Sequence, residues 1–234
     1  MFNKHPKGLI AAALANLGER FGFYTMMAIL VLFLQAKFGM NGKEAGFIYS
    51  TFYFSIYILA LVGGIIADKT RNYKGTIFTG IVLMAVGYLL LAIPSKTPVD
   101  NKMLYLVITC ASLFVIAFGN GLFKGNLQAL VGQMYDNPQY ANMRDSGFSL
   151  FYMFINIGAI FAPFAAVGVR NWWLSTFGYN YDADLPALCH GQLAGTLSPE
   201  ATETYHTLVT KAFTAPVQDY TAFASDYLNV FTTG

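Results

Sequence analysis

Three ionisable side chains interrupt long apolar stretches of this sequence, namely Glu19, Arg20 and Lys124. Glu19 lies about 11 residues into the first stretch, which is about 17 Å deep in a helix that rises roughly 1.5 Å per residue. That depth is near the middle of a membrane whose hydrocarbon core is about 30 Å thick. Charged residues at such a depth are costly and normally face a polar interior that marks a pathway. A buried carboxyl group near two cations can switch its protonation when one of them moves.

Each of these charges also has a structural interpretation. Glu19 and Arg20 could form an ion pair that locks helices together, and Lys124 could extend its side chain to the membrane surface. Against the second alternative, the apolar pattern continues beyond Lys124. Glycines at positions 119, 121 and 125 allow close helix approach or bending there. The recurrence of charge in two separate apolar stretches favours a functional cavity.

Other polar and aromatic residues accompany these charges. The face of the first helix that carries the Glu-Arg pair is formed, at helical spacing, by Asn16, Glu19, Arg20, Phe23, Tyr24 and Met27. Asn156, in the fifth apolar stretch, is a further candidate, although it could equally make a packing hydrogen bond. The group of Gly64, Asp68 and Lys69 joins a small-residue helix end to a charged turn, which fits a gating hinge or a solvated loop.

The composition places these side chains in a lipid bilayer. Of 234 residues, 56% are hydrophobic and 11% are charged, whereas a soluble domain carries roughly 25% charged residues. A net charge of +2 provides no large basic field for binding nucleic acid. The sequence contains no HExxH or GxSxG motif, and its three histidines make no metal-binding pair. We therefore predict that the chain is not an enzyme and has neither a metal site nor a cofactor.

Five apolar segments reach the roughly 20 residues needed to span a bilayer. They cover residues from about 8 to 36, 44 to 67, 76 to 93, 103 to 134 and 148 to 169. Short loops between them make neighbouring helices alternate in direction. The predicted fold is an all-α membrane protein with a transmembrane bundle at residues 1–170. Residues 171–234 are predicted to form an extramembrane insert with two short amphipathic helices, one capped by Ser198 and one following Pro216.

Four runs of residues resemble the signatures of one transporter family. The run Gly18–Tyr24 is similar to the first-helix ExxERF signature of the proton-dependent oligopeptide transporter (POT/PTR) family, within the major facilitator superfamily. Phe148–Ile160 resembles the fifth-helix signature and Gly119–Asn126 the fourth-helix signature. Gly63–Lys74 resembles the family's form of the superfamily loop motif. The four runs occur in the family's order and spacing, over about residues 15–165.

The resemblance implies five helices of an amino-terminal bundle, with a cytoplasmic amino terminus, in an incomplete major facilitator fold. The carboxy-terminal bundle, which would supply the other wall of the cavity, is then a missing partner, so we expect a fragment or a split gene. The implied function is symport of protons with di- or tripeptides by a multi-pass protein of the cell inner membrane. The family's proton-coupling and peptide-binding roles carry over to Glu19, Arg20, Phe23, Tyr24, Tyr57, Lys124 and Asn156.

Four positions depart from the family pattern. Asn16 replaces the first glutamate of the ExxER motif, and Met27 stands where peptide-binding members often carry arginine. Phe23 replaces a frequent tyrosine, and Gly125 replaces the usual proline after the lysine. Two alternatives therefore stay open. One is a proton-independent or non-peptide small-solute carrier of the same fold, and the other is a non-transporting, truncated membrane module.

Overall fold

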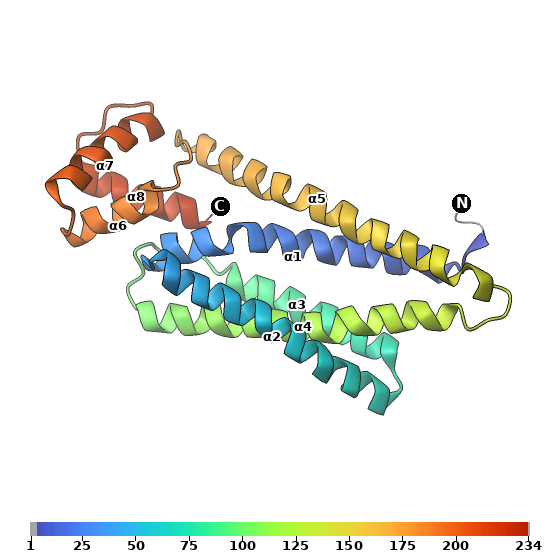
Figure 1. The fold of residues 1–234 in the computed structure, drawn as a ribbon. Helices are drawn as coiled ribbons and strands as arrows, with labels where there is room; N and C mark the ends of the chain where they lie inside the picture. Colours follow the sequence, from blue (N-terminus) through green and yellow to red (C-terminus); the bar gives the residue numbers. More distant parts are fainter. Residues whose placement is uncertain (1–3, 234) are drawn as a thin grey trace. The chain divides into compact units, whose positions relative to one another are not determined.

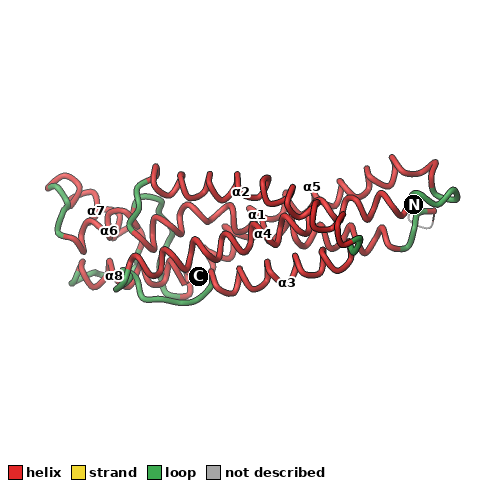
Figure 2. The backbone as a smooth tube through the Cα atoms, turned by 90° about the horizontal axis from the view of Figure 1, so that it is seen from below, coloured by secondary structure: helices red, strands yellow, loops and turns green. Residues whose placement is uncertain are grey.

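The computed structural model describes residues 4–233, which are almost entirely helical and contain no β-strand (Figures 1 and 2). The helices are α1 Gly8–Phe38, α2 Gly42–Thr70, α3 Tyr73–Leu91, α4 Lys102–Met134, α5 Arg144–Thr176, α6 Leu185–Ala194, α7 Pro199–Ala212 and α8 Tyr220–Thr233. The helices α1 to α5 are long and apolar enough to cross a membrane, with mean hydropathies from 1.6 to 2.1. The prediction of an all-α membrane fold with five spans is confirmed.

The connection between α2 and α3 is tighter than the sequence predicts. We expected a loop from Asp68 to Gly75, but α2 continues to Thr70 and α3 begins at Tyr73. The left-handed backbone of Arg71, with φ of 52°, ends α2 as helix C-termini commonly do. The Asn72 side chain then accepts a hydrogen bond from the Gly75 amide at 3.0 Å. The tight turn leaves Asp68 inside the last turn of α2, where its carboxylate accepts a hydrogen bond from the Tyr73 hydroxyl at 2.5 Å.

The chain divides into two compact units, each of which contains parts of several long helices. The first unit, called here the cavity unit, comprises the residues up to Met26, Ser50–Leu91 and Ile108–Pro163. The second, called here the tail unit, comprises Met27–Tyr49, Ala92–Val107 and the residues from Phe164 onward. These are units of packing. The predicted division into membrane and extramembrane parts at residue 170 is a separate question, and it stays a prediction.

Small residues allow the helices of the cavity unit to approach closely. A Cβ atom added to Gly80 of α3 would lie 2.6 Å from the Gly119 carbonyl oxygen of α4. A Cβ atom added to Gly158 of α5 would lie 2.7 Å from the Leu17 carbonyl oxygen of α1. Such contacts are typical of helix packing in membranes, where small side chains bring backbones together. They bring α3 against α4 and α5 against α1, and α1 and α4 are the helices that carry the charged residues of the candidate site.

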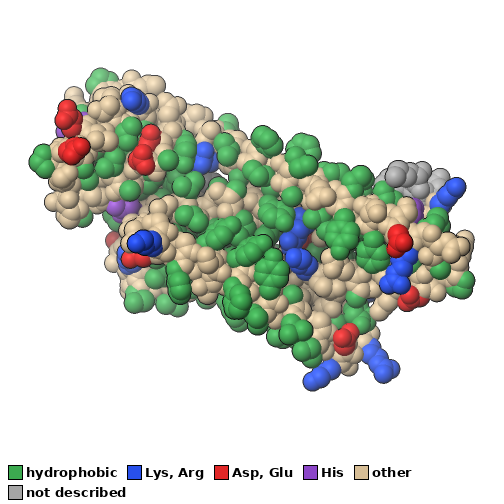
Figure 3. Space-filling model, viewed as in Figure 1, with side chains coloured by type: hydrophobic (Ala, Val, Ile, Leu, Met, Phe, Trp, Pro, Cys, Tyr) green, Lys and Arg blue, Asp and Glu red, His purple; other side chains and the backbone are tan. Residues whose placement is uncertain are grey.

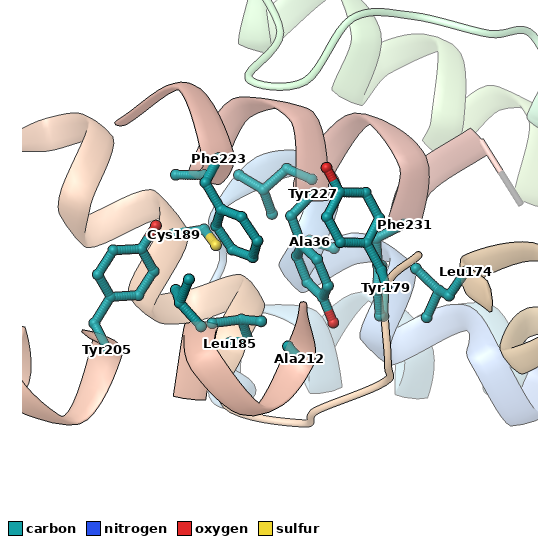
Figure 4. Packing of buried hydrophobic residues seen from close by; sticks show 13 residues of the cluster. Ala36, Leu174, Tyr179, Leu185, Cys189, Tyr205, Ala212, Phe223, Tyr227 and Phe231 are labelled. Atoms are coloured by element: carbon teal, nitrogen blue, oxygen red, sulfur yellow. The ribbon is translucent and has the colours of Figure 1, made fainter. Parts of the chain in front are cut away.

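The tail unit is organised around a cluster of buried aromatic and aliphatic side chains (Figure 4). The sequence predicted helices at Ser198 and after Pro216, and α7 and α8 lie there. Ser198 accepts a hydrogen bond from the Ala201 amide at 3.2 Å, as an N-cap residue does. The sequence missed α6, because its ten residues show almost no amphipathic pattern; it ends at Gly195, whose φ is 65°.

Two hydrogen bonds attach α8 to the end of a longer helix and to a loop in the same unit. The indole nitrogen of Trp173 in α5 donates to the Val230 carbonyl at 3.0 Å. The Thr97 amide donates to the Asn229 side chain at 2.5 Å. The α5 helix itself runs to Thr176, beyond its predicted end near residue 169.

Hydrophobic side chains cover much of the surface drawn in Figure 3, as expected for a protein whose solvent is partly lipid.

Candidate functional site

The centre of the candidate site is an ion pair between neighbouring residues of α1. The Arg20 Nε atom donates to Glu19 Oε2 at 2.5 Å, and Arg20 Nη2 donates to Glu19 Oε1 at 2.7 Å. The two side chains are only 6% and 7% exposed, respectively. A bidentate arginine–carboxylate pair is the strongest common form of charge-assisted hydrogen bonding. The ion pair that the sequence offered as the structural alternative is therefore formed, buried and held in one geometry, and its role in proton coupling stays a prediction.

Asn120 of α4 donates a third hydrogen bond to the carboxylate of Glu19. Its Nδ2 atom donates to Glu19 Oε1 at 2.5 Å, so this oxygen accepts two hydrogen bonds while Oε2 accepts one. The Asn120 side chain is fully buried. Sequence analysis missed Asn120, although one signal could have found it. Asn120 lies four residues before Lys124, so both occupy the same face of α4.

Aromatic rings lie against the guanidinium group of Arg20. Its Cζ atom is 4.9 Å from the ring centroid of Phe23 and 5.8 Å from that of Tyr24. The two rings meet edge to face, with centroids 5.5 Å apart. These cation–π distances fall within the range that stabilises a cation away from water. Phe23 and Tyr24 therefore contact the ion pair, as their helical spacing predicts.

Lys124 of α4 faces tyrosines of α2. Its Nζ atom lies 5.4 Å from the ring centroid of Tyr57, whose hydroxyl donates to the Tyr53 hydroxyl at 3.0 Å. Lys124 is half-buried. Among residues 4–233, the only ion pair with a nitrogen–oxygen distance within 4.0 Å is that of Glu19 and Arg20. Lys124 is thus near the cluster yet has no carboxylate within ion-pair distance. Tyr53 was also missed, although it precedes Tyr57 by one helical turn.

The other candidate residues make no hydrogen bond or ion pair with this cluster within the described residues. Asn156 is on α5 with an exposed side chain, and Asn16 of α1 is buried at 4% exposure. Asp68 and Lys69 are exposed in the last turn of α2, and Gly64 lies one turn before them. Within the described residues, no group of three His, Cys, Asp or Glu side chains could hold a metal ion. The roles assigned to Asn156 and to the group of Gly64, Asp68 and Lys69 stay predictions.

The chemistry of the cluster follows from its charges. One carboxylate stands against two cations, Arg20 and Lys124, so the cluster carries a net positive charge while Glu19 is ionised. Protonation of Glu19 would raise that charge further. A site of this kind can hold an anionic group, and its affinity for the anion depends on the proton that Glu19 binds or releases.

Comparison with known proteins gives consistent matches. The model of the POT family matches residues 74–189. The chain is 34% identical over 185 residues to the peptide transporter YePEPT of Yersinia enterocolitica, covering 77% of this chain and 34% of that protein. It is 34% identical over 179 residues to dipeptide and tripeptide permease A of Enterobacter sp., covering 76% of this chain and 32% of that protein. The chain thus spans about a third of the length of these curated relatives.

Solved structures give the same result for the fold. A crystal structure of the peptide transporter POT in complex with sulfate matches with a TM-score of 0.63 and 27% identity. The match covers 90% of this chain and 45% of that one. The crystal structure of tetrameric PepTSo2 also matches with a TM-score of 0.63, at 26% identity over 96% of this chain and 48% of that one. The helices described here therefore correspond to less than half of each solved transporter.

Proposed function

Because the chain belongs to the POT family and shares the major facilitator fold of its solved relatives, we propose that it is part of a secondary transporter importing di- and tripeptides with protons. The observation that carries this proposal is the buried pair of Glu19 and Arg20, with Lys124 nearby. Ionisable groups inside a membrane bundle are costly and rare, and they usually mark a substrate or ion pathway. Two relatives are a peptide transporter and a dipeptide and tripeptide permease, which supports the substrate class.

Proton binding and anion binding are linked in this proposal through Arg20. While Glu19 is charged, it accepts both guanidinium hydrogen bonds of Arg20. A proton taken from the external water onto a carboxylate oxygen of Glu19 cancels the negative charge, and Arg20 loses its counter-ion. The guanidinium is then available to the carboxylate of a peptide, which binds arginine with the same bidentate geometry. Release of the proton to the cytoplasm restores the Glu19–Arg20 pair and expels the peptide carboxylate.

Lys124 and the tyrosines of α2 form the second half of the proposed peptide site. The ammonium group of Lys124 contacts the face of Tyr57, an interaction weaker than a charge-assisted hydrogen bond. A peptide carboxylate offers Lys124 a stronger partner, so peptide binding would draw the ammonium group away from the ring. The hydroxyls of Tyr53 and Tyr57 supply donors beside it. The gating role of Gly64, Asp68 and Lys69 and the substrate contact of Asn156 belong to the same proposal.

One observation favours a second candidate function. Asn16 is buried one helical turn before Arg20, at the position where the family signature has a glutamate. An amide does not titrate in the physiological range, so this half of the transporter has lost one proton acceptor. A carrier of the same fold that moves peptides or other small solutes without protons is therefore the alternative.

Uptake by the full-length protein distinguishes these functions. The protein is reconstituted in liposomes and supplied with labelled dialanine, with and without an inside-negative, alkaline-inside gradient. We expect the gradient to raise both the rate of uptake and the final accumulation. Dialanine counterflow that no gradient enhances would favour the proton-independent carrier. The absence of uptake of any di- or tripeptide by folded protein would reject the peptide assignment.

We also propose that the protein resides in the inner membrane with the segment after residue 170 outside the cytoplasm. Thr196, between α6 and α7, is exposed, whereas the native Cys189 is fully buried. A Thr196→Cys variant in a Cys110→Ala background should react with an impermeant thiol reagent added to intact cells. The matched control is the same background without the new cysteine. Labelling of Thr196→Cys only after lysis would contradict this topology.

A further inference from the structure

Asn120 uses only half of its hydrogen-bonding capacity. Its Nδ2 atom donates to Glu19 Oε1 at 2.5 Å, and the Met84 sulfur lies 3.9 Å from the same nitrogen. Its Oδ1 atom is buried and accepts no hydrogen bond from any residue between 4 and 233. A buried amide oxygen without a partner is destabilising and rare in native proteins. This oxygen therefore requires an explanation.

The two ends of the amide match the two protonation states of Glu19. An ionised carboxylate only accepts hydrogen bonds, so it needs the Nδ2 donor that faces it here. A protonated carboxyl group carries an O–H donor, which needs an acceptor instead. Rotation of the Asn120 amide about its terminal torsion, which is broad and roughly two-fold, would turn Oδ1 toward Glu19. Asn120 Oδ1, which has no partner while Glu19 is charged, would then accept a hydrogen bond from the O–H group of protonated Glu19.

The arrangement of donors indicates which partner would yield when Glu19 is protonated. Glu19 Oε1 accepts from both Arg20 Nη2 and Asn120 Nδ2, whereas Oε2 accepts from Arg20 Nε. A proton on Oε1 displaces a donor from that oxygen. Until a peptide carboxylate binds Arg20, Arg20 keeps its second hydrogen bond to Oε2, while Asn120 has no other hydrogen bond to Glu19 among the described contacts. The amide is therefore the group that must turn.

We propose that Asn120 is a positioning residue that responds to the protonation of Glu19 by turning its amide group. The proposal rests on the function proposed above and adds a device that transmits proton binding from α1 to α4. Lys124 lies one helical turn beyond Asn120 on the same face of α4, so the change occurs next to the lysine of the anion site. The other ionisable groups that interact with this cluster are Arg20, Tyr24, Tyr53, Tyr88 and Lys124.

Asn126 provides a matched control on the same helix. It is buried like Asn120, but its Nδ2 atom donates to the backbone carbonyls of Gly63 at 3.0 Å and Leu122 at 2.8 Å. Backbone carbonyls have no second protonation state. Replacement of Asn126 should weaken the packing of α2 against α4 without changing how Glu19 titrates.

Infrared spectroscopy of the full-length protein tests the proposal directly. The carboxyl band of protonated Glu19 is identified by its absence from the Glu19→Gln variant and is followed as the pH changes. Asn120→Leu removes a hydrogen bond to the charged form that is stronger than the one lost by the neutral form. We therefore expect the band's midpoint to move upward by about one pH unit. Asn120→Ser, which keeps a donor and an acceptor, should move it less, and Asn126→Leu should leave it unchanged.

The same variants are assayed for the pH profile of gradient-driven dialanine uptake, which should move in the same direction as the band. If the band and the profile of Asn120→Leu and Asn120→Ser both match the wild type, the proposal is wrong, even where uptake is proton-driven. An equal shift in Asn126→Leu would also overturn it, because the effect would then be one of general packing. If the band moves as expected in a protein that transports no peptide, the function proposed above fails and the role of Asn120 stands.

Discussion

The cavity unit and the tail unit satisfy their buried polar groups in different ways. In the cavity unit, Arg20 and Asn120 both donate to the side chain of Glu19, so the network runs from side chain to side chain across two helices. In the tail unit, the Tyr205 hydroxyl donates to the Tyr220 carbonyl at 2.7 Å. The Trp173 indole likewise donates to a backbone carbonyl, that of Val230. The first network has a titratable centre, whereas the second is anchored on helix backbone.

The hydrogen bonds around Glu19 in the cavity unit can change with protonation, whereas those to backbone carbonyls in the tail unit cannot. Backbone carbonyls neither titrate nor rotate within a helix, so hydrogen bonds to them persist while the helices persist. Burial raises the pKa of Cys189 to about 12, and burial also raises the pKa of the Tyr205 and Tyr227 hydroxyls. These three groups stay protonated at physiological pH. The hydrogen bonds of these three groups are therefore expected to persist across the physiological pH range.

The largest effect that we expect comes from Lys124→Ala in the full-length protein. Lys124→Ala removes the charge-assisted hydrogen bond proposed for the peptide carboxylate, which is worth about 1.5–3 kcal/mol, and each 1.4 kcal/mol is about tenfold in rate. Gradient-driven dialanine uptake should therefore fall by about 10- to 100-fold. The matched control is Lys211→Ala, at an exposed lysine of α7 in the tail unit, which should transport normally. Wild-type uptake by Lys124→Ala would mean that this lysine only extends to the membrane surface.

Glu19→Gln should separate proton coupling from substrate binding. Glutamine has the shape of the protonated acid and costs less to bury, so the protein should fold. Gradient-driven accumulation should fall to near equilibrium, while counterflow should stay within about twofold of wild type because it needs no net proton movement. Driven uptake and counterflow are measured in the same liposomes.

The reverse change, Asn16→Glu, adds an acid where the family signature has one, and it should shift the pH optimum of driven uptake. Full gradient-driven accumulation by Glu19→Gln would show that a group other than Glu19 carries the proton coupling. That result would contradict the view that Glu19 is the titrating centre of the cavity unit.

A smaller effect is expected from the core of the tail unit. Tyr205 is fully buried, so Tyr205→Ala should destabilise the packing of α6 to α8 by about 3–5 kcal/mol. Tyr205→Phe removes only the hydroxyl that donates to the Tyr220 carbonyl, which should cost about 1 kcal/mol. Amide hydrogen exchange over residues 185–233 measures both. The midpoint of the Glu19 infrared band should stay unchanged, and a shift in it would show that the two units are coupled.

The sequence predicted the spans and the position of charges inside them because both depend on local rules. Apolar length identifies a membrane helix, and a charge inside one identifies a buried site whatever its partners. Ser198 and Pro199 predicted the start of α7 from capping chemistry alone. These features need no knowledge of which helices pack together.

The features that the sequence did not predict depend on packing between helices. Asn120 is an ordinary polar residue in an apolar stretch, and its contact with Glu19, 101 residues away, appears only when α1 and α4 are placed together. The helix α6 lacks an amphipathic pattern, so its burial against Tyr205 and Tyr227 could not be foreseen. The left-handed cap at Arg71 was missed because glycine usually occupies such a position.

The smallest effect concerns His190, a largely buried histidine of the tail unit whose protonation we expect to lower stability. Its Nε2 atom lies 2.6 Å from the Ala36 carbonyl oxygen, near the end of α1. Burial lowers the pKa of His190, the hydrogen bond to Ala36 opposes this, and the charge of Lys102 lowers the pKa further. The folded-state pKa is therefore below the unfolded value of about 6.5. As the pH falls below that value, the unfolded chain binds more protons than the folded one, so the contribution of His190 to stability is progressively lost.

His190→Gln should remove this pH dependence, because a glutamine amide can donate to the Ala36 carbonyl and does not titrate. Hydrogen exchange over residues 185–233 is compared at about pH 8 and about pH 5.5, on either side of the unfolded-state pKa. The intrinsic effect of pH on exchange is corrected with unfolded peptides. Wild type should lose more protection on acidification than His190→Gln, and the two should agree closely at the higher pH. Equal losses would mean that His190 does not set the acid response, and a greater loss in His190→Gln would reverse the sign of the linkage argued here.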